Sequence, residues 1–483
     1  MNRRTFLRTA GASGIPLMAT PAMAASEKAP AGQLDYRRSI PVAERYDVVV
    51  CGGGASGVAA ALAAGRSGLK VLLVEAHGQL GGNATSGLVS HWLGGRTGDC
   101  ERWVVGGIFR SLSKEAAARG SALIPGPTQG AYQPHGWKKG QLAAGIPFDP
   151  YGVAVLLDQR IEQAGIDMVL LSEVVDAVVE EGRITHVVVM NKSGLTAIPA
   201  AAVIDATGDA DVAARTGCPF DKGRDEDGLM TPTSLMFHVD NVDQDALAAY
   251  IETHRAPRFR EKIAELREAG EWDFPYEIFI SVQLHEKGTM MINTIRLVGI
   301  DGTDGRSLSE GMVRGRVEVQ RLMELMRKHF PGFAQARVKA VAPTLGVRET
   351  RRIRGAYRLT VADLSSNRDF ADTIGFSSYG WDLPDPRRPS DNPGHGQKRE
   401  VTPIPYRVMV PQHITNLICP GRSISVERPV LGPLRVMAPC MAMGEAAGQA
   451  AQQAVRDDRP FAEVDTTALR RDLAAHDAIV EWE

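Results

Sequence analysis

The sequence predicts an α/β fold that is built on a parallel sheet and carries a second, inserted domain of α+β type. An apolar run at 47–51 is followed by a glycine turn, an alanine-rich stretch and a second apolar run at 71–74, which indicates strand, helix and strand. Between about 221 and 402 the pattern changes to short alternating segments, such as 235–239 and 290–295, which indicate a separate β-sheet. A chain of 483 residues is also long enough for two interlocked domains.

The glycine turn Gly52-Gly-Gly-Ala-Ser-Gly57 has the G-x-G-x-x-G pattern that sets a helix N-terminus against a pyrophosphate. Gly52 permits the tight turn, Gly54 lets backbone N–H groups approach a phosphate, and Gly57 allows the helix to pack closely on the strand. Glu75 ends the second strand, 18 residues after Gly57, where a carboxylate can accept a hydrogen bond from a ribose hydroxyl. This context predicts a Rossmann-like, dinucleotide-binding domain. The alternative is a glycine turn in an ordinary α/β domain.

Further elements complete the first domain. The C-terminal segment 416–422 is predicted as a strand and turn, and a helix follows over 435–448. Gly444 and Gly448 share one face of that helix, which indicates close approach of a backbone or of a flat ring. The pattern also predicts an amphipathic helix at 151–164, a β-hairpin from 174–179 and 184–189, a strand at 202–205 and a helix at 309–330.

Composition and charge restrict the class of function. The formal net charge of −2 gives no reason to expect binding to nucleic acid or to an anionic membrane. No stretch holds eighteen consecutive apolar residues, so no transmembrane segment is predicted. The five cysteines form no C-x-x-C pair, and no histidines and carboxylates have metal-ligand spacing, so no metal site is predicted.

The N-terminus predicts export. Arg3-Arg4 is followed by a mild apolar stretch and by Ala22-Met23-Ala24, which together are typical of a twin-arginine signal peptide over 1–24, cut after Ala24. A basic disordered tail is the alternative. Because the twin-arginine (Tat) route carries folded proteins, it suits an enzyme that takes up its nucleotide in the cytoplasm. We therefore expect a periplasmic or secreted protein, with a polar linker at 25–44.

The motifs in order resemble the FAD-dependent oxidoreductases of the glutathione-reductase-like superfamily, and most closely those that border the fumarate reductase and succinate dehydrogenase flavoproteins. The resemblance rests on the glycine turn, Glu75, Gly81-Gly82, the segment 203–209 and Gly421-Arg422 with the helix after it. It covers about 45–220 and 400–456, with a weaker match through 345–355. The organisation that it implies is a GR2-type FAD-binding domain in two parts, 45–220 and 401–460, around a substrate or cap domain at 221–400, with a C-terminal tail at 461–483.

The resemblance implies FAD as the cofactor and assigns its contacts residue by residue. Arg422 stands where many superfamily members have an acid, so its side chain could instead reach phosphate or substrate. The helix that starts near Ala438 would direct its N-terminus at the pyrimidine edge of the flavin. The implied contacts are Gly52, Gly54, Ala55, Ser56 and Gly57 at the pyrophosphate, Glu75 at the ribose, Gly81, Gly82 and Asn83 along the ribityl and flavin, Val174 at the adenine, Thr207, Gly208 and Asp209 in a second turn, and Gly421 and Arg422 near the ribityl chain.

Two side chains are the catalytic candidates. Arg351 lies in a segment with five arginines, Arg348 to Arg358, and could hold a substrate carboxylate, because guanidinium matches that group in a bidentate contact. The alternative is an ion-pair network with Glu349 and other acids. His91 follows the Gly81-Gly82 loop and could act as a base or attach the flavin, although Val89-Ser-His-Trp92 does not match the attachment pattern of complex II.

The expected reaction is hydride transfer between flavin N5 and a small organic substrate. No second strand, G-x-G-x-x-G turn and helix follow residue 76, whereas superfamily members that take electrons from NADPH normally have such a unit. The other electron partner is then a quinone, a redox protein or oxygen. The alternatives are an NAD-dependent dehydrogenase and a redox-neutral flavin-binding protein.

Overall fold

The computed structural model describes residues 32, 34–126, 144–255 and 258–483. The predicted signal peptide, 1–24, lies outside the described residues, and so do residues 25–31 and 33 of the predicted linker. The chain divides into two units, Met1–Ser39 and the compact unit Ile40–Glu483. All of the elements below belong to Ile40–Glu483.

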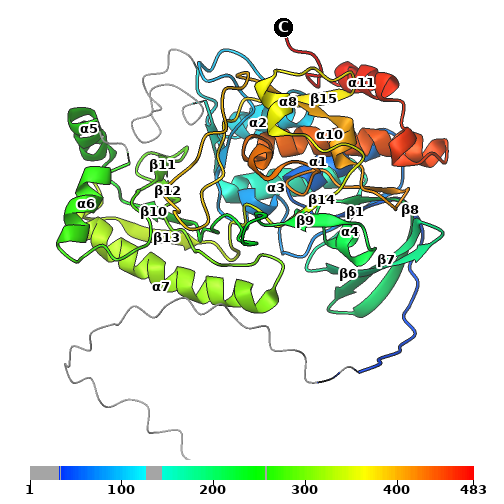
Figure 1. Ribbon diagram of the computed structural model, residues 1–483, viewed down its shortest axis with the longest axis horizontal. Helices are drawn as coiled ribbons and strands as arrows, with labels where there is room; N and C mark the ends of the chain where they lie inside the picture. The colour runs from blue at the N-terminus through cyan, green and yellow to red at the C-terminus, as the bar shows by residue number, and fades with distance from the viewer. Residues whose placement is uncertain (1–31, 33, 127–143, 256–257) are drawn as a thin grey trace, which may run out of the picture. The chain divides into compact units, whose positions relative to one another are not determined.

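One region of the fold is built on a seven-stranded sheet with the order β5-β2-β1-β8-β7-β6, in which β17 also pairs with β8 (Figure 1). The parallel strands are β1 (Tyr46–Cys51), β2 (Val71–Val74), β5 (Asp167–Val169), β17 (Leu417–Ile418) and the second half of β8 (Gly194–Asp205). The first half of β8 continues an antiparallel meander with β7 (Arg183–Asn191) and β6 (Glu173–Glu180). The predicted α/β class, with its parallel sheet and β-hairpin, is confirmed.

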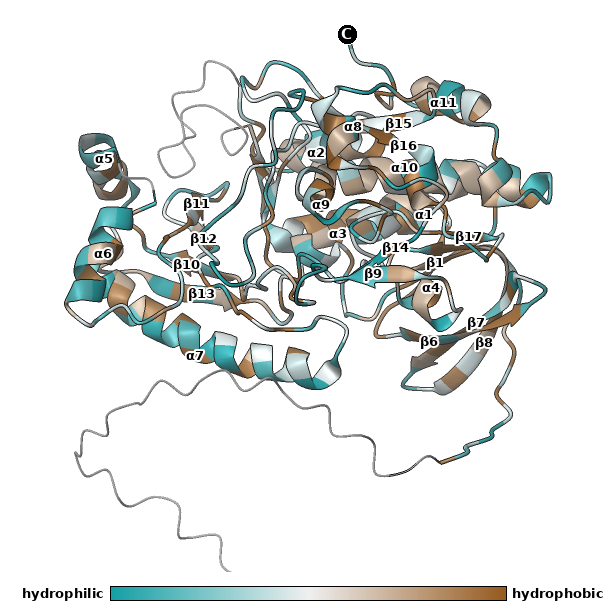
Figure 2. Cartoon of the chain, in the orientation of Figure 1, coloured by the Kyte–Doolittle hydropathy of each residue, from teal (hydrophilic) through white to brown (hydrophobic). Residues whose placement is uncertain are grey.

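Two buried helices, α1 (Ala55–Arg66) and α10 (Met437–Arg456), pack directly on each other. A Cβ atom added to Gly444 would overlap the carbonyl oxygen of Ser56, and one added to Gly448 would overlap that of Ala60. The two glycines therefore let α10 approach the backbone of α1. Of the two partners that the sequence allowed, a backbone or a flat ring, the structure shows the backbone. Figure 2 shows that α10 is apolar over most of its length, where it is brown to tan, and hydrophilic at its C-terminal end, where it is teal. The residues from Met437 to Ala451 are all buried.

A second region has its own sheet and its own core. Its four strands have the order β11-β12-β10-β13, and the helices α5, α6 and α7 gather beside them (Figure 1). The 25-residue helix α7 (Gly305–His329) starts where the Asp304 side chain accepts a hydrogen bond from Ser307 N, four residues before the predicted start. Its buried face contributes to a separate cluster with aromatic residues such as Trp272 and Phe330. The other elements of this region are β10 (Phe237–Asp240), α5 (Gln244–His254), α6 (Arg260–Glu268), β11 (Ser281–Gln283), β12 (Met290–Ile292) and β13 (Arg337–Val341).

The C-terminal 461–483 segment contains a helix, α11 (Thr466–Ala475), that the sequence did not predict. Leu469 and Leu473 are buried, and Asp477 accepts a hydrogen bond from Gly107 N. No helix within the described part of the chain is long and apolar enough to cross a membrane. The remaining elements are η1 (Gly82–Ala84), β3 (His91–Trp92), α2 (Gly107–Ala118), β4 (Ile146–Pro147), α3 (Pro150–Gln163), α4 (Asp211–Arg215), β9 (Phe220–Lys222), β14 (Arg351–Ile353), α8 (Val361–Ser365), β15 (Thr373–Ser377), β16 (Thr402–Pro405), η3 (Tyr406–Met409), η4 (Arg428–Val430), α9 (Leu431–Leu434) and η5 (Phe461–Glu463).

Candidate functional site

A cavity of about 630 Å³ lies where β1, β2 and β8 end, at the carboxyl edge of the sheet. Ligands of open α/β sheets bind at this edge. Of the predicted cofactor contacts, only Gly57 is absent from the lining. Those that line the cavity are Gly52, Gly54, Ala55, Ser56, Glu75, Gly81, Gly82, Asn83, Val174, Thr207, Gly208, Asp209, Gly421 and Arg422.

The glycine turn leaves its backbone open to the cavity. Gly52 has a φ of +103°, which side chains of L-residues rarely adopt, and a Cβ atom there would meet the Ala206 carbonyl oxygen at 2.5 Å. Gly54 caps α1 without any side-chain cap, and a Cβ atom at Gly54 would meet nothing within 4 Å. The first N–H groups of α1 thus face an open space, as anion binding at a helix N-terminus requires.

Gly57 has a different position from its neighbours in the turn. A Cβ atom there would overlap the carbonyl oxygen of Gly52 and meet the Ala206 side chain at 3.2 Å. The residue therefore brings α1 close to the end of β1, which is the packing role that the fingerprint predicts. It contributes to the site through that packing and lies behind the cavity wall.

Glu75 is fixed by the backbone on both oxygens. Its Oε2 accepts a hydrogen bond of 2.6 Å from Gly53 N, and its Oε1 accepts one of 2.7 Å from His77 N. The residue is 5% exposed, and it lines the cavity. Each carboxylate oxygen can accept a second hydrogen bond, so the acid is held in place with capacity left for a hydroxyl.

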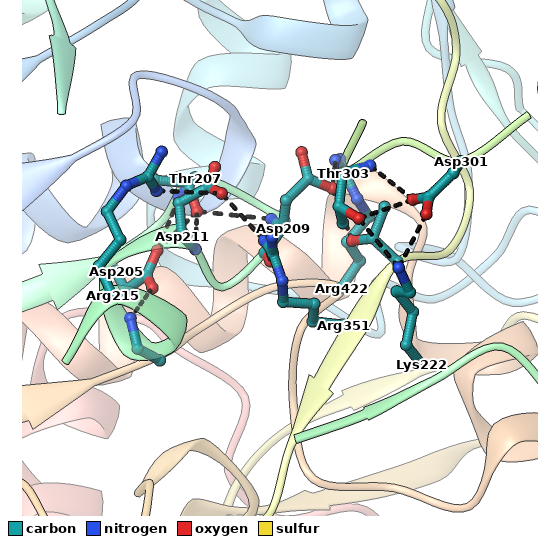
Figure 3. Close-up of polar contacts among 12 residues, drawn as sticks. Asp205, Thr207, Asp209, Asp211, Arg215, Lys222, Asp301, Thr303, Arg351 and Arg422 are labelled. Atoms are coloured by element: carbon teal, nitrogen blue, oxygen red, sulfur yellow. Dashed lines mark hydrogen bonds and ion pairs between the residues drawn. The ribbon is translucent and has the colours of Figure 1, made fainter. Parts of the chain in front are cut away.

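The second turn, after β8, is held by a buried acid that the sequence did not single out as a site residue. Asp205 Oδ1 accepts from the Thr207 hydroxyl at 2.7 Å, and its Oδ2 accepts from Ala213 N at 2.9 Å (Figure 3). Burial raises the pKa of Asp205 to about 6, against the opposing effect of these hydrogen bonds. The acid thereby holds the turn with Thr207 and Gly208 at the cavity. The one sequence signal for this role of Asp205 is its position in the run Val-Ile-Asp-Ala-Thr-Gly.

Arg422 contacts an acid instead of open space. Its Nη2 donates to Asp209 Oδ1 at 2.6 Å, and the same carboxylate oxygen accepts from the Thr350 hydroxyl at 2.6 Å (Figure 3). A Cβ atom at Gly208 would lie 2.7 Å from Arg422 Nη1. The sequence left phosphate and substrate open as partners of Arg422. In the structure its side chain instead contacts Asp209, in the second turn.

Arg351 does not line the cavity. Its Nη1 donates to the Asp209 carbonyl oxygen at 2.9 Å and to Asp211 Oδ1 at 3.0 Å, and its guanidinium lies over the Phe220 ring (Figure 3). These contacts favour the ion-pair interpretation of the arginine segment. Two neighbouring arginines also form ion pairs, Arg352 with the buried Glu349 and Arg354 with Asp221.

His91 is buried in the short strand β3, beside Gly145, and it is not among the residues that line the cavity. Its ring lies against the Gly145 backbone, and this contact opposes the effect of burial on its pKa. Burial lowers the pKa of His91 to about 4, so the ring is neutral at pH 7. The neighbouring Trp92 packs against Phe109 and Phe148, which makes this strand part of the main core.

Further residues that are not among the predicted contacts also line the cavity, and one of them, Arg348, belongs to the predicted arginine segment. Arg348 and Arg435 both line it, as do Met437 and Cys440 in the first turn of α10. No side chain caps α10 either. Within the described ranges no three His, Cys, Asp or Glu side chains are placed to hold a metal ion.

The sequence profile of the family described as FAD dependent oxidoreductase matches residues 47–473. The chain belongs to this family, and it is an FAD-dependent oxidoreductase. A search of curated protein sequences gives no match.

A search of solved structures gives matches at low sequence identity, with TM-scores below 0.5 for the three named here. A geranylgeranyl bacteriochlorophyll reductase-like protein from Thermoplasma acidophilum has 14% identity over 90% of this chain and 84% of that chain, with a TM-score of 0.46. The L-amino acid deaminase of Proteus myxofaciens has 12% identity over 91% of this chain and 96% of that chain, with a TM-score of 0.42. The myxobacterial chondrochloren halogenase has 13% identity over 89% and 78%, with a TM-score of 0.45.

The residues at the cavity fit FAD. The open space at Gly54 and the uncapped N-terminus of α1 suit a pyrophosphate, while Glu75 has free lone pairs for a hydroxyl. The uncapped N-terminus of α10 suits a group that gains negative charge on reduction.

Proposed function

We propose that the protein transfers a hydride between the N5 atom of FAD and a small organic substrate. One observation carries the proposal: the cavity of this family member joins the glycine turn and Glu75 to the N-terminus of α10 and to two arginines from outside the nucleotide motifs. FAD, when bound, supplies the hydride acceptor or donor. The membership of the family favours this function over an NAD-dependent dehydrogenase.

The chain's own residues supply binding and electrostatics. The N–H groups after Gly54 would hold the pyrophosphate, and Glu75 would hold the ribose. The N-terminus of α10 would favour the reduced cofactor, because a helix N-terminus stabilises nearby negative charge by up to ~2 kcal/mol in a partly buried site. The motifs also support a place among the glutathione-reductase-like flavoproteins that border fumarate reductase, as part of the same proposal.

An anaerobic screen of small organic compounds tests the reaction. The holoenzyme is mixed with each compound in the absence of oxygen, and flavin absorbance is followed. Loss of the oxidised-flavin absorbance with one compound class, together with recovery of the oxidised product, is the expected result. A protein whose stable flavin is bleached by no compound, and whose chemically reduced flavin reduces none, would be a redox-neutral flavin protein instead.

The second electron partner is a quinone, a redox protein or oxygen. The three are separated by mixing the reduced holoenzyme with oxygen, with a soluble quinone or with a one-electron redox protein, and by comparing the rates of flavin reoxidation. The fastest of these identifies the class of partner. Equal and slow rates with all three would remove them from the proposal.

We further propose that the protein is exported by the twin-arginine route to the periplasm or beyond. Arg3-Arg4 and Ala22-Met23-Ala24 support it. Changing both arginines to lysine should leave the holoenzyme in the cytoplasm, as measured by flavin and protein content of the cell fractions. The matched control changes Arg37 and Arg38 to lysine, beyond the expected cleavage point, and should leave export intact. Export of the Arg3/Arg4 variant at the normal level would contradict the twin-arginine route.

A further inference from the structure

Three arginines from distant parts of the chain meet beside the cavity. Arg296 and Arg348 both donate to the same atom, Asn293 Oδ1, at 3.0 Å and 3.1 Å. Arg435 donates from Nη2 to the Asp382 carbonyl oxygen at 2.7 Å and to Asp382 Oδ2 at 3.2 Å. The positive charges of Arg296 and Arg435 oppose the ionisation of Arg348, and the charge of Arg435 opposes that of Arg296, so the three form one electrostatic group.

This arginine cluster, Arg296, Arg348 and Arg435, has too little negative charge around it. Asp382 is the one carboxylate that forms an ion pair with any of the three, within residues 34–126, 144–255 and 258–483. The two stretches of Ile40–Glu483 that the structure does not describe, 127–143 and 256–257, contain no Asp or Glu. Three guanidinium groups against one carboxylate leave a net charge of +2.

The cluster is buried, which makes the excess charge costly. Arg296 is 4% exposed and Arg348 is 9% exposed. The Nε atoms of Arg296 and Arg435 are buried and have no hydrogen-bond partner among the described residues. Burial of a charged group without a counter-charge is strongly unfavourable, and it is normally compensated by pairing.

The ionisation of the cluster reflects the same shortage. Burial lowers the pKa of Arg296 to about 10, so this side chain keeps its charge at pH 7. Burial, together with the positive charges of Arg296 and Arg435, lowers the pKa of Arg348 well below its usual value. An anion at the cluster would relieve this opposition to the charged form.

Two of the three arginines, Arg348 and Arg435, line the cavity, and Arg296 is absent from the lining. Tyr379 donates to Asp382 Oδ2 at 2.8 Å and so shares the acid with Arg435. Among the described residues, Arg348 donates only to neutral acceptors, the Pro232 carbonyl oxygen at 2.7 Å and Asn293 Oδ1. Hence the one carboxylate is shared between Tyr379 and Arg435, and Arg348 lines the cavity without an acid of its own among these residues.

We propose that Arg348 and Arg435, supported by the charge of Arg296, bind a carboxylate group of the substrate, so that the substrate is an organic acid. Guanidinium groups match carboxylates through two parallel N–H donors and keep their charge where water is excluded. The inference rests on the proposed function, because it concerns the substrate of the same cavity. The pyrophosphate is assigned to other groups of the same cavity, the first N–H groups of α1, which no side chain caps.

Binding of inert acids to the holoenzyme tests the inference without requiring turnover. Malonate and benzoate are titrated against the flavin absorbance spectrum, beside malonamide and benzamide, at constant ionic strength set with sodium chloride. Saturable spectral shifts with the acids, and Kd values at least about 10-fold higher for the amides, are expected. No saturation by either acid, or equal binding of an acid and its amide, would overturn the inference.

A pair of variants assigns the effect to the cluster. Arg348→Gln should raise the Kd of the acids by about 10- to 100-fold, the usual effect of losing a charged hydrogen bond, while FAD remains bound. Arg354→Gln is the matched control, because Arg354 lies on the same segment, is 60% exposed and pairs with Asp221; its Kd should not change. If Arg348→Gln fails to fold, Arg348→Lys, which keeps the charge and loses the bidentate contact, takes its place with the same direction of effect.

The outcomes also separate this inference from the proposed function. An unchanged Kd in the Arg348 variant, or loss of FAD from a folded variant, would overturn the inference, since the arginine would then serve another group or the cofactor. Acid binding that depends on Arg348, in a holoenzyme whose flavin no compound reduces, would uphold the carboxylate site and contradict hydride transfer.

Discussion

Two groups of residues at the cavity, the nucleotide end around the glycine turn and Glu75 and the arginine cluster, differ in how they meet a ligand. The nucleotide end consists of backbone and glycines from short, continuous segments, and its groups are held in place by the fold, as Glu75 is by its bonds from Gly53 N and His77 N. The arginine cluster consists of long side chains from three distant segments, and two of its Nε atoms have no partner among the described residues. The nucleotide end offers a ligand backbone groups that the fold already holds in place, whereas the arginine cluster offers buried positive charge that lacks a full counter-charge within the described ranges.

This difference follows from what each group has to recognise. A cofactor is always the same molecule, so fixed N–H groups at a helix N-terminus can hold it at little cost in side-chain entropy. A substrate must be discriminated from similar molecules, and buried groups that stay unpaired without it penalise those that lack the matching group. The following predictions test this contrast between the two groups.

Gly54→Val should have the largest effect, because it removes the open space at the nucleotide end. A Cβ atom at Gly54 would meet no protein atom within 4 Å, so the valine side chain would fit the fold but would fill the space before α1. We expect folded protein without FAD, measured as the ratio of flavin to protein after acid release and chromatography. Gly394→Val is the control, because Gly394 is exposed and equally open. Normal FAD content in Gly54→Val would contradict the backbone recognition of pyrophosphate.

The nucleotide end and the general fold could be predicted because their determinants are local in sequence. The glycine turn and the acid of Glu75 are adjacent to the strands that they follow, so pattern and spacing were enough. The Gly444 and Gly448 face was also recognised, but only the structure showed that it meets the backbone of α1.

The arginine cluster could not be predicted, because Arg296, Arg348 and Arg435 meet only in the folded chain. The segment 348–358 was correctly singled out as rich in arginine, but sequence alone could not say which side chain faces the cavity. Arg351 begins β14, which pairs with β9, and this places its guanidinium at Asp209 and Asp211, while Arg348 precedes the strand and lines the cavity.

Acid should destabilise both regions through one buried histidine in each. Burial lowers the pKa of His91, beside the nucleotide region, and of His238, in the sheet of the second region, to about 4. The unfolded chain therefore takes up these protons at a higher pH than the folded chain does. The stabilisation is complete above about pH 6.5 and is lost as the pH falls to about 4, by about 3 kcal/mol for each histidine.

Urea denaturation at several pH values between 7 and 4 measures this loss. His91→Gln and His238→Gln should each flatten the pH dependence of the unfolding free energy by a similar amount, relative to their own values at pH 7. A flattening confined to one variant would show that only that region buries a neutral histidine. An unchanged slope in both would contradict the lowered pKa values.

The smallest expected effect compares two arginines that lie three residues apart. Arg351→Lys should reduce stability by about 1 kcal/mol, because lysine keeps a charge near Asp211 but cannot also reproduce the contact with the Asp209 carbonyl. Flavin reduction per folded molecule should stay normal, since Arg351 is absent from the cavity lining. Arg348→Lys should have the reverse pattern, with substrate-driven flavin reduction slowed. The melting temperature and the anaerobic rate of flavin reduction are measured on both variants. A slowed reduction in Arg351→Lys would place Arg351 in the active site. It would contradict the proposal that Arg348 serves the substrate while Arg351 serves the structure.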